Sequence, residues 1–121
     1  MYLLTQDVSI LTVLADPTRQ VLLQLLRHRC LPVGELAARL PVSRPAVSQH
    51  LRILRKAQLV SEQRRGTRHY FSLNPTGFAE ARAYLDAMWQ DALRAFAAHV
   101  AEQESIKKQK AKRRKDKQNV Q

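Results

Sequence analysis

The stretch VSRPAVSQHLRILRKAQLV, residues 42–60, combines an apolar and a polar pattern at helical spacing. Val47, Leu51 and Leu54 recur three and four residues apart, which puts them on one face of a helix. Ser43 is a good N-cap and a proline is tolerated in a first turn, so we predict a helix from Arg44 to about Gln58. Its other positions carry the polar side chains Arg44, Ser48, Gln49, Arg52 and Arg55. The central question is what this polar face contacts.

The flanking segments place this helix in a larger motif. VGELAARL, residues 33–40, predicts a short helix that ends at Pro41, and it is separated from the next helix by three or four residues, the spacing of a helix-turn-helix. LVSEQR and RHYFSL then have strand character and flank Arg65-Gly66-Thr67, where glycine can take the positive φ of a tight turn. We therefore predict a helix-turn-helix over about 33–58 and a β-hairpin wing over about 59–73.

Helices are predicted on both sides of this motif. Asp16-Pro17 begins one helix, with Val21, Leu22, Leu25 and Leu26 facing inward, and a shorter helix over about 4–15 precedes it. Asn74-Pro75 opens a long last helix over about 75–104. The predicted fold class is mainly α with a small β-hairpin (α+β): a winged helix-turn-helix domain over 1–104.

The last predicted helix is too long, at about 1.5 Å per residue, to be covered by so small a domain. Its apolar residues would be exposed in a single chain, and exposed apolar surface of this size invites association. We therefore predict a homodimer formed through the terminal helices. The predicted interface residues are Leu85, Met88, Trp89, Ala92 and Phe96.

The charge of the chain is strongly positive and unevenly distributed. The 121 residues carry a formal net charge of +11, which attracts polyanions such as nucleic acids. Residues 105–121, SIKKQKAKRRKDKQNVQ, hold eight Lys/Arg and one Asp, with few apolar residues to drive folding. We predict a mostly disordered basic tail, which is either a solubilising tail or a frayed helix end, or an extension that binds DNA phosphates. The absence of an apolar run of about 18 residues, or of a signal peptide pattern, predicts a cytoplasmic protein.

The polar face of the central helix has the side chains that read DNA bases. Arg makes paired hydrogen bonds to guanine, Gln does so to adenine, and Ser serves either. We predict that Arg44, Ser48, Gln49 and Arg52 read bases and that Ser43 contacts phosphate. Arg64, Arg65 and Arg68 of the wing would hold the adjacent backbone or minor groove. His50 either contacts phosphate or packs under the helix.

Three segments together resemble the ArsR/SmtB family of bacterial winged-helix transcriptional repressors. They are LADPTRQVLLQLL, VGELAARLPVSRPAVSQHLRILRKAQLV and RRGTRHYFSLNPTGFAEARAYLDAMW. The resemblance implies a homodimer that binds an inverted-repeat operator in double-stranded DNA and is released when an inducer binds. It also implies that Arg44, Pro45, Ser48 and Gln49 occupy base-reading positions, with Ser43 and His50 next to the backbone.

The sequence departs from this family at its metal sites. Many members have Cys-Val-Cys before the DNA-reading helix, whereas this chain has Pro32-Val33-Gly34, which offers no ligand. A second family site, on the last helix, is matched by Asp86, His99 and Glu102, but Met88 replaces a histidine there. Met is a poor zinc ligand among oxygens, so we predict no metal site and no cofactor. The inducer stays unidentified.

Cys30 is the only cysteine in the chain, so no intramolecular disulfide is possible. A lone thiol can be oxidised, but no second cysteine is present to resolve the product. We interpret Cys30 as a small buried apolar residue rather than a redox sensor.

Two alternative functions are those of a nonspecific architectural DNA-binding protein and of an enzyme. A nonspecific architectural DNA-binding protein would use the wing and the tail and show little preference among sequences. An enzyme is not predicted, because the four histidines fit no nucleophile, base and carboxylate order, and no phosphate-binding glycine loop is present. The mixed base-reading set favours a sequence-specific regulator.

Overall fold

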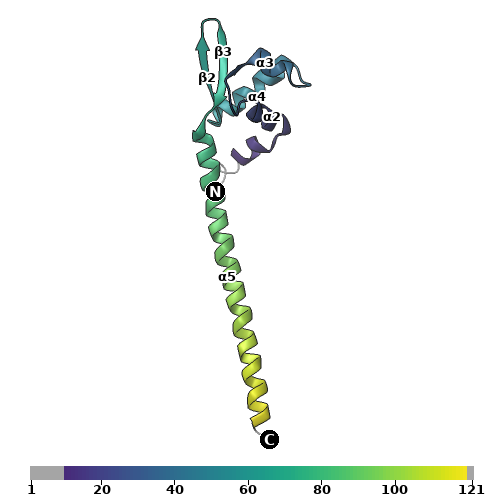
Figure 1. Ribbon diagram of the computed structural model, residues 1–121, viewed down its shortest axis with the longest axis vertical. Coiled ribbons are helices and arrows are strands. Elements are labelled where there is room, and N and C mark those ends of the chain that lie inside the picture. The colour runs from purple at the N-terminus through teal and green to yellow at the C-terminus, as the bar shows by residue number, and fades with distance from the viewer. Residues whose placement is uncertain (1–9, 120–121) are drawn as a thin grey trace. The chain divides into compact units, whose positions relative to one another are not determined.

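A computed structural model describes residues 10–119 (Figure 1). Residues 10–15 are helical, and residues 1–9, which include part of the predicted first helix, lie outside the described residues. The chain divides into two compact units, one ending at Tyr84 and one beginning at Leu85. The elements follow in the order α2 (Pro17–Leu25), β1 (Leu31–Pro32), α3 (Val33–Ala38), α4 (Arg44–Lys56), β2 (Val60–Arg65), β3 (Arg68–Leu73) and α5 (Pro75–Asn119).

The core of the first unit is formed by apolar side chains from every element, including Phe71 of β3 and Ala81 of α5. The most completely buried side chains are Leu22, Leu36, Leu51, Leu54, Leu59, Val47 and Val60. In α2 the predicted inward position of Val21 is wrong, because Val21 is 40% exposed and Leu23 is buried instead. Consecutive apolar residues in VLLQLL allow either rotation of the helix, and the rotation adopted buries the larger leucine, which removes more apolar area from water.

The strands form one antiparallel sheet in the order β1-β3-β2. β2 and β3 make the predicted wing hairpin, in which Arg65 pairs with Arg68 and Gly66 takes a φ of 64° in the turn. The short strand β1, which pairs Leu31 with Phe71, was not predicted. Its two residues are too few for an alternating pattern, and Pro32 is tolerated because β1 lies at the edge of the sheet.

The predicted helix-turn-helix is confirmed, with somewhat shorter helices. α3 ends at Ala38, so the turn covers residues 39–43 rather than three or four residues. The hydroxyl of Ser43 accepts a hydrogen bond from the amide of Ala46 at 3.3 Å and caps α4 as predicted. Two residues before the predicted end, α4 stops at Lys56.

The end of α4 is a Schellman motif with an unusual residue in it. Gln58 has a φ of 58°, a conformation that usually belongs to glycine, and its amide donates to the carbonyl of Arg55 at 3.0 Å. The amide of Leu59 donates to the carbonyl of Leu54, also at 3.0 Å, and both leucine side chains are fully buried. The chain therefore leaves α4 in a fixed direction towards β2.

The first turn of α5 is attached to this same motif. The amide of Gly77 donates to the carbonyl of Gln58 at 2.7 Å, and the amide of Asn74 donates to the carbonyl of Leu59 at 2.9 Å. Of the two residues that the sequence offers as a cap, Asn74 and Thr76, Asn74 caps α5, because its side-chain oxygen accepts from the amide of Thr76 at 3.0 Å. The DNA-reading helix predicted from sequence and the start of α5 are thus joined through backbone hydrogen bonds.

The second unit consists of α5 from Leu85 onward. The prediction of a disordered tail is wrong for residues 105–119, because α5 continues through Asn119. This stretch contains neither Gly nor Pro and is rich in Lys, Arg and Gln, which have high helix propensity. Extending an existing helix also avoids the cost of nucleation, which the compositional argument for disorder neglected. No helix within residues 10–119 is long and apolar enough to cross a membrane.

Candidate nucleic-acid interface

The two faces of α4 have the division that the sequence predicted. Val47, Leu51 and Leu54 are buried in the core, with exposures of 1% or less. Arg44, Pro45, Ser48, Gln49 and Arg52 are all exposed. The structure therefore brings the predicted base-reading residues together on the outer face of one helix.

Arg44 also borders the wing. Its guanidinium lies beside α3, where a Cβ on Gly34 would be 3.8 Å from Nη1 of Arg44. A groove at this place is lined by Pro32, Val33, Gly34, Glu35, Arg44, Thr67, Arg68 and His69. Arg44 of α4 and Arg68 of β3 thus share one depression in the surface, and both are exposed cations that a phosphate can reach.

A second groove separates α4 from the wing. Its lining includes Ser48, Arg52 and Arg55 of α4 and Glu62, His69 and Phe71 of the hairpin. Arg55 does not project freely with the other polar residues of α4, because its Nη1 forms an ion pair with Glu62. Oε1 of Glu62 also lies 2.6 Å from Nδ1 of His69, within ion-pair distance. Arg55, Glu62 and His69 therefore connect the helix to the wing.

Glu62 and His69 were not predicted from the sequence to be part of this surface. Strand alternation carries the signal that could have found them, because the register pairs Glu62 with Phe71 and Arg64 with His69. Paired residues point to the same face of a sheet, so all four lie on the face that carries the buried Phe71. A carboxylate on that face needs a cation nearby, and α4 supplies Arg55.

The three wing arginines lie at the tip of the hairpin and are exposed. Nε of Arg64 donates to the carbonyl of Gly66 at 3.3 Å, and the guanidinium of Arg65 stacks 5.0 Å from the ring centre of Tyr70. Arg65 and Arg68 pair across the strands and share the face opposite Arg64. The tip therefore presents cations on both faces of the hairpin.

His50 lies on a different side of α4. It is half-buried, and Nη1 of Arg19 in α2 is 3.4 Å from its Nδ1. Arg19 is itself held by the carbonyl of Val13 at 2.8 Å and by the carboxylate of Asp16. Of the two predicted roles for His50, these contacts favour packing under the helix over phosphate contact. The amide of Arg19 lowers the pKa of Asp16, the N-cap residue of α2.

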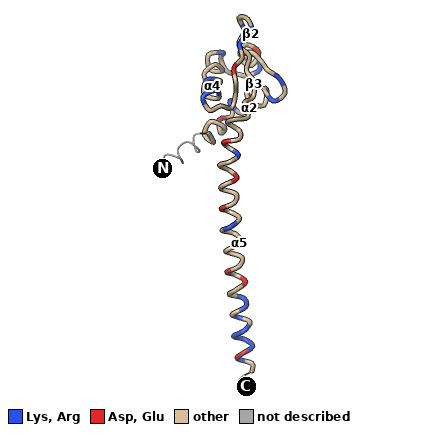
Figure 2. Tube along the Cα trace, turned by 90° about the vertical axis from the view of Figure 1, so that its left-hand side faces the viewer, with Lys and Arg blue, Asp and Glu red and all other residues tan. Residues whose placement is uncertain are grey.

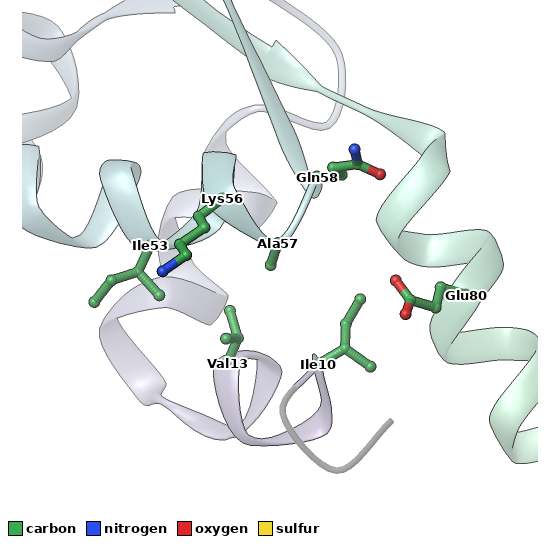
Figure 3. A pocket seen from close by; sticks show the side chains of 7 residues that line it. All are labelled: Ile10, Val13, Ile53, Lys56, Ala57, Gln58 and Glu80. Atoms are coloured by element: carbon green, nitrogen blue, oxygen red, sulfur yellow. The ribbon is translucent and has the colours of Figure 1, made fainter. Parts of the chain in front are cut away.

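A cavity of about 600 Å³ lies elsewhere in the first unit (Figure 3). Figure 3 shows Ile53 and Lys56 entering it from α4, Glu80 from α5, and Ile10 and Val13 from the helix over residues 10–15. Four of its seven lining residues are apolar, and the polar ones are Lys56, Gln58 and Glu80. It is separate from the grooves beside the wing, and no sequence pattern predicted it.

The residues that match the second metal site of the family do not form a cluster in the described chain. Within residues 10–119 there is no group of three His, Cys, Asp or Glu side chains close enough to hold a metal ion. Asp86 and His99 both lie on α5, where thirteen residues span about 20 Å. The prediction that Cys30 is buried is wrong, because its side chain is exposed. It lies in the loop between α2 and β1, where a small apolar side chain has no core to join.

The predicted dimer residues are all exposed on α5. Leu85 is 54% exposed, Trp89 60% and Phe96 66%. Together with Met88 and Ala92 they lie at offsets of three, four, seven and eleven residues from Leu85, so they form one apolar face on the helix. A single chain leaves this face in contact with water.

Comparisons with known proteins identify the type of domain. A helix-turn-helix domain family matches residues 14–63. The chain is 52% identical over 84 residues to the HTH-type transcriptional regulator Rv2034 of Mycobacterium tuberculosis, covering 69% of this chain and 78% of that protein. It is 37% identical to the transcriptional repressor SdpR of Bacillus subtilis, covering 56% of this chain and 76% of SdpR.

A solved structure of a transcriptional regulator has a similar fold. The ArsR-like transcriptional regulator from Rhodococcus sp. RHA1 superposes with a TM-score of 0.71 at 26% identity, covering 81% of this chain and 92% of that one. The relatives are named as regulators of transcription, not as enzymes. This chain belongs to the ArsR/SmtB family of winged helix-turn-helix transcriptional regulators.

Proposed function

We propose that this protein is a sequence-specific transcriptional repressor that binds an inverted-repeat operator as a homodimer. The observation that carries the proposal is the outer face of α4, where Arg44, Ser48, Gln49 and Arg52 are exposed together beside the wing. Arg and Gln are the residues that recognise guanine and adenine in the major groove. The opposite face of α4 is buried, so only this side is free to enter a groove.

The remaining predicted residues support binding without reading sequence. Ser43, at the N-terminus of α4, is exposed and lies where amide groups favour a phosphate. The exposed Arg64, Arg65 and Arg68 can neutralise phosphates beside the site that α4 reads. We leave His50 out of the proposed DNA contacts because it packs against Arg19. Since its partner is chromosomal DNA, the protein acts in the bacterial cytoplasm.

Dimerisation is proposed through the apolar face of α5. The exposed side chains of Leu85, Met88, Trp89, Ala92 and Phe96 have no partner to cover them within residues 10–119. A second copy of the same face would remove them from water, and homodimer interfaces are typically apolar in this way. A two-fold dimer then places two α4 helices on half-sites about 10 to 10.5 base pairs apart, or a multiple of that.

The test is fluorescence anisotropy on the DNA upstream of the gene and on a scrambled duplex, at one near-physiological salt concentration. We expect a preference of about a thousandfold or more for the operator. Arg44→Ala and Gln49→Ala should each weaken operator binding by about 1 to 3 kcal/mol and leave the scrambled duplex unaffected.

Two variants outside the proposed interface serve as controls. Arg27→Ala removes one exposed positive charge, and Gln24→Ala removes one exposed amide on α2. Both should bind the operator like the parent protein. Equal losses for Arg44→Ala on operator and scrambled DNA would mean that Arg44 reads no base. Equal parent affinity for every duplex tried, upstream DNA included, would favour the architectural alternative.

A further inference from the structure

The end of α5 carries a dense set of cations. Between residues 105 and 119 the helix holds eight basic residues and one acidic residue, Asp116. All of these residues are exposed, and Figure 2 shows that the Lys and Arg positions, in blue, are concentrated along the last turns of α5. The basic residues are Lys107, Lys108, Lys110, Lys112, Arg113, Arg114, Lys115 and Lys117.

These cations surround the helix rather than form one stripe. The apolar face of α5 runs from Leu85 to Val100, and the positions that continue this face are Lys107, Lys110 and Arg114. If two copies paired along the whole of α5, lysines would face lysines in a parallel pair and apolar residues near Leu85 in an antiparallel pair, and both arrangements destabilise helix pairing. The apolar dimer face therefore ends near Val100, and residues 105–119 form a surface of a different kind.

The basic side chains of this segment are not paired with carboxylates in the part of the chain that the structure describes. Within residues 10–119, none of the eight basic side chains forms an ion pair or a hydrogen bond with another residue. Asp116 is the only carboxylate among these turns. An excess of unpaired positive charge on a rigid helix favours an external polyanion as partner.

The composition of residues 105–119 fits double-stranded DNA better than a membrane or single-stranded RNA. Eleven residues of helix span about 16 Å, so the eight cations of Lys107–Lys117 lie about one per 2 Å, close to the one negative charge per 1.7 Å of double-stranded DNA. Insertion into a membrane needs an apolar face, and only Ile106 and Ala111 are apolar here. Binding of single-stranded RNA uses aromatic stacking, and residues 105–119 contain no aromatic residue.

We propose that residues 105–119 form a second DNA-binding element, which contacts phosphates that flank the operator without reading sequence. This inference rests on the proposed function, because α4 and the wing bring the flanking duplex to a high effective concentration near the tethered helix. The element extends the footprint of the dimer beyond its half-sites. It also makes affinity more dependent on salt than the winged domain alone requires.

The experiment compares the full-length parent with a variant in which all eight basic residues of 107–117 are replaced by Gln. Gln has nearly the helix propensity of Lys and Arg, so circular dichroism should report the same helix content. The charge-conserving control replaces the six lysines of this segment by Arg. Each protein is titrated from 50 to 200 mM salt on the operator core, on the core with about ten base pairs added at each end, and on scrambled duplexes of both lengths.

If each chain contacts about two flanking phosphates, the Gln variant should lose about 3.6 units of salt slope per dimer on the long duplexes. We expect its affinity for the long operator duplex at 150 mM salt to fall at least about tenfold, and its affinity for the short core to match that of the parent. The Arg control should behave like the parent on every duplex.

Equal salt slopes for parent and Gln variant on the long duplexes would overturn the proposal. The proposal would also be overturned if the Gln variant lost as much affinity for single-stranded RNA of equal length. The element would then be a general binder of polyanions. These outcomes are independent of the proposed function. The proposed function fails if the parent binds the short operator core no better than its scrambled form. The contribution of residues 105–119 is measured separately, by comparing the salt slopes of the parent and the Gln variant on one long duplex of any sequence.

Discussion

Replacing Gly77 by alanine tests the junction between α4 and α5. A Cβ built on Gly77 would lie 2.6 Å from the carbonyl oxygens of both Ala57 and Gln58, whereas ordinary van der Waals contact begins at 3.4 Å. Both obstructing atoms belong to backbone that the Schellman motif holds in place. No side-chain rotation relieves this overlap, so the first turn of α5 must move away from the end of α4.

The size of the effect follows from these distances. A retreat of about 0.8 Å would lengthen the Gly77 to Gln58 hydrogen bond from 2.7 Å to about 3.5 Å, beyond the range of a normal bond. Losing that bond costs about 0.5 to 1.5 kcal/mol, and the strained packing adds about 1 to 3 kcal/mol. Alanine regains about 1 kcal/mol through its higher helix propensity. We expect Gly77→Ala to lower the free energy of unfolding by about 0.5 to 3.5 kcal/mol.

Gly34→Ala is the matched control. Gly34 also lies in a helix, α3, but a Cβ there would meet only the Arg44 side chain, at 3.8 Å. Helix propensity alone then raises the free energy of unfolding, by about 0.5 to 1 kcal/mol. Both variants are measured by urea unfolding at one protein concentration, because the stability of a dimer depends on concentration. The reasoning is refuted if Gly77→Ala is as stable as the parent.

The remaining predictions concern the dimer face and the helix cap. Trp89→Ala should raise the dimer dissociation constant at least about tenfold in sedimentation equilibrium, because buried tryptophans contribute much of the binding energy of interfaces. The neighbouring variant Gln90→Ala should leave the dissociation constant unchanged. If Trp89→Ala also leaves it unchanged, Trp89 is not in the interface. Ser43→Ala should cost about 1 kcal/mol of stability through the lost cap, whereas Ser43→Asp should keep the cap and weaken binding to all DNA by repelling phosphate. If Ser43→Asp binds DNA like the parent, Ser43 lies away from the backbone.

The features that were predictable from sequence are those in which local chemistry and periodicity agree. Ser43 and Pro45 mark the start of α4, and the apolar spacing of Val47, Leu51 and Leu54 determines which face is buried. The hairpin was predictable because Gly66 lies between two segments of strand character, and it does take a positive φ. In each case the residue itself restricts the backbone, so little depends on distant parts of the chain.

The features that were not predicted correctly depend on contacts with residues outside the local sequence. β1 exists because Leu31 and Pro32 lie beside β3, which no local pattern in two residues can signal. Gln58 takes a backbone conformation typical of glycine because the α4–β2 junction and Gly77 hold it there. The rotation of α2 depended on which apolar residues the core accepts. The helical state of residues 105–119 depended on the helix already formed before them, whereas composition alone suggested disorder.

The outer and inner faces of α4 can be changed independently, and this separates recognition from folding. Exposed substitutions such as Gln49→Ala touch no core atom, so they should change stability by less than about 0.5 kcal/mol. Leu51 and Leu54 are buried behind them, and truncating either would cost about 2 to 5 kcal/mol. DNA sequence preference can therefore diverge among relatives without loss of the fold. The two ends of α4 lack this freedom, because Ser43 and the carbonyl of Gln58 each hold the helix in its place.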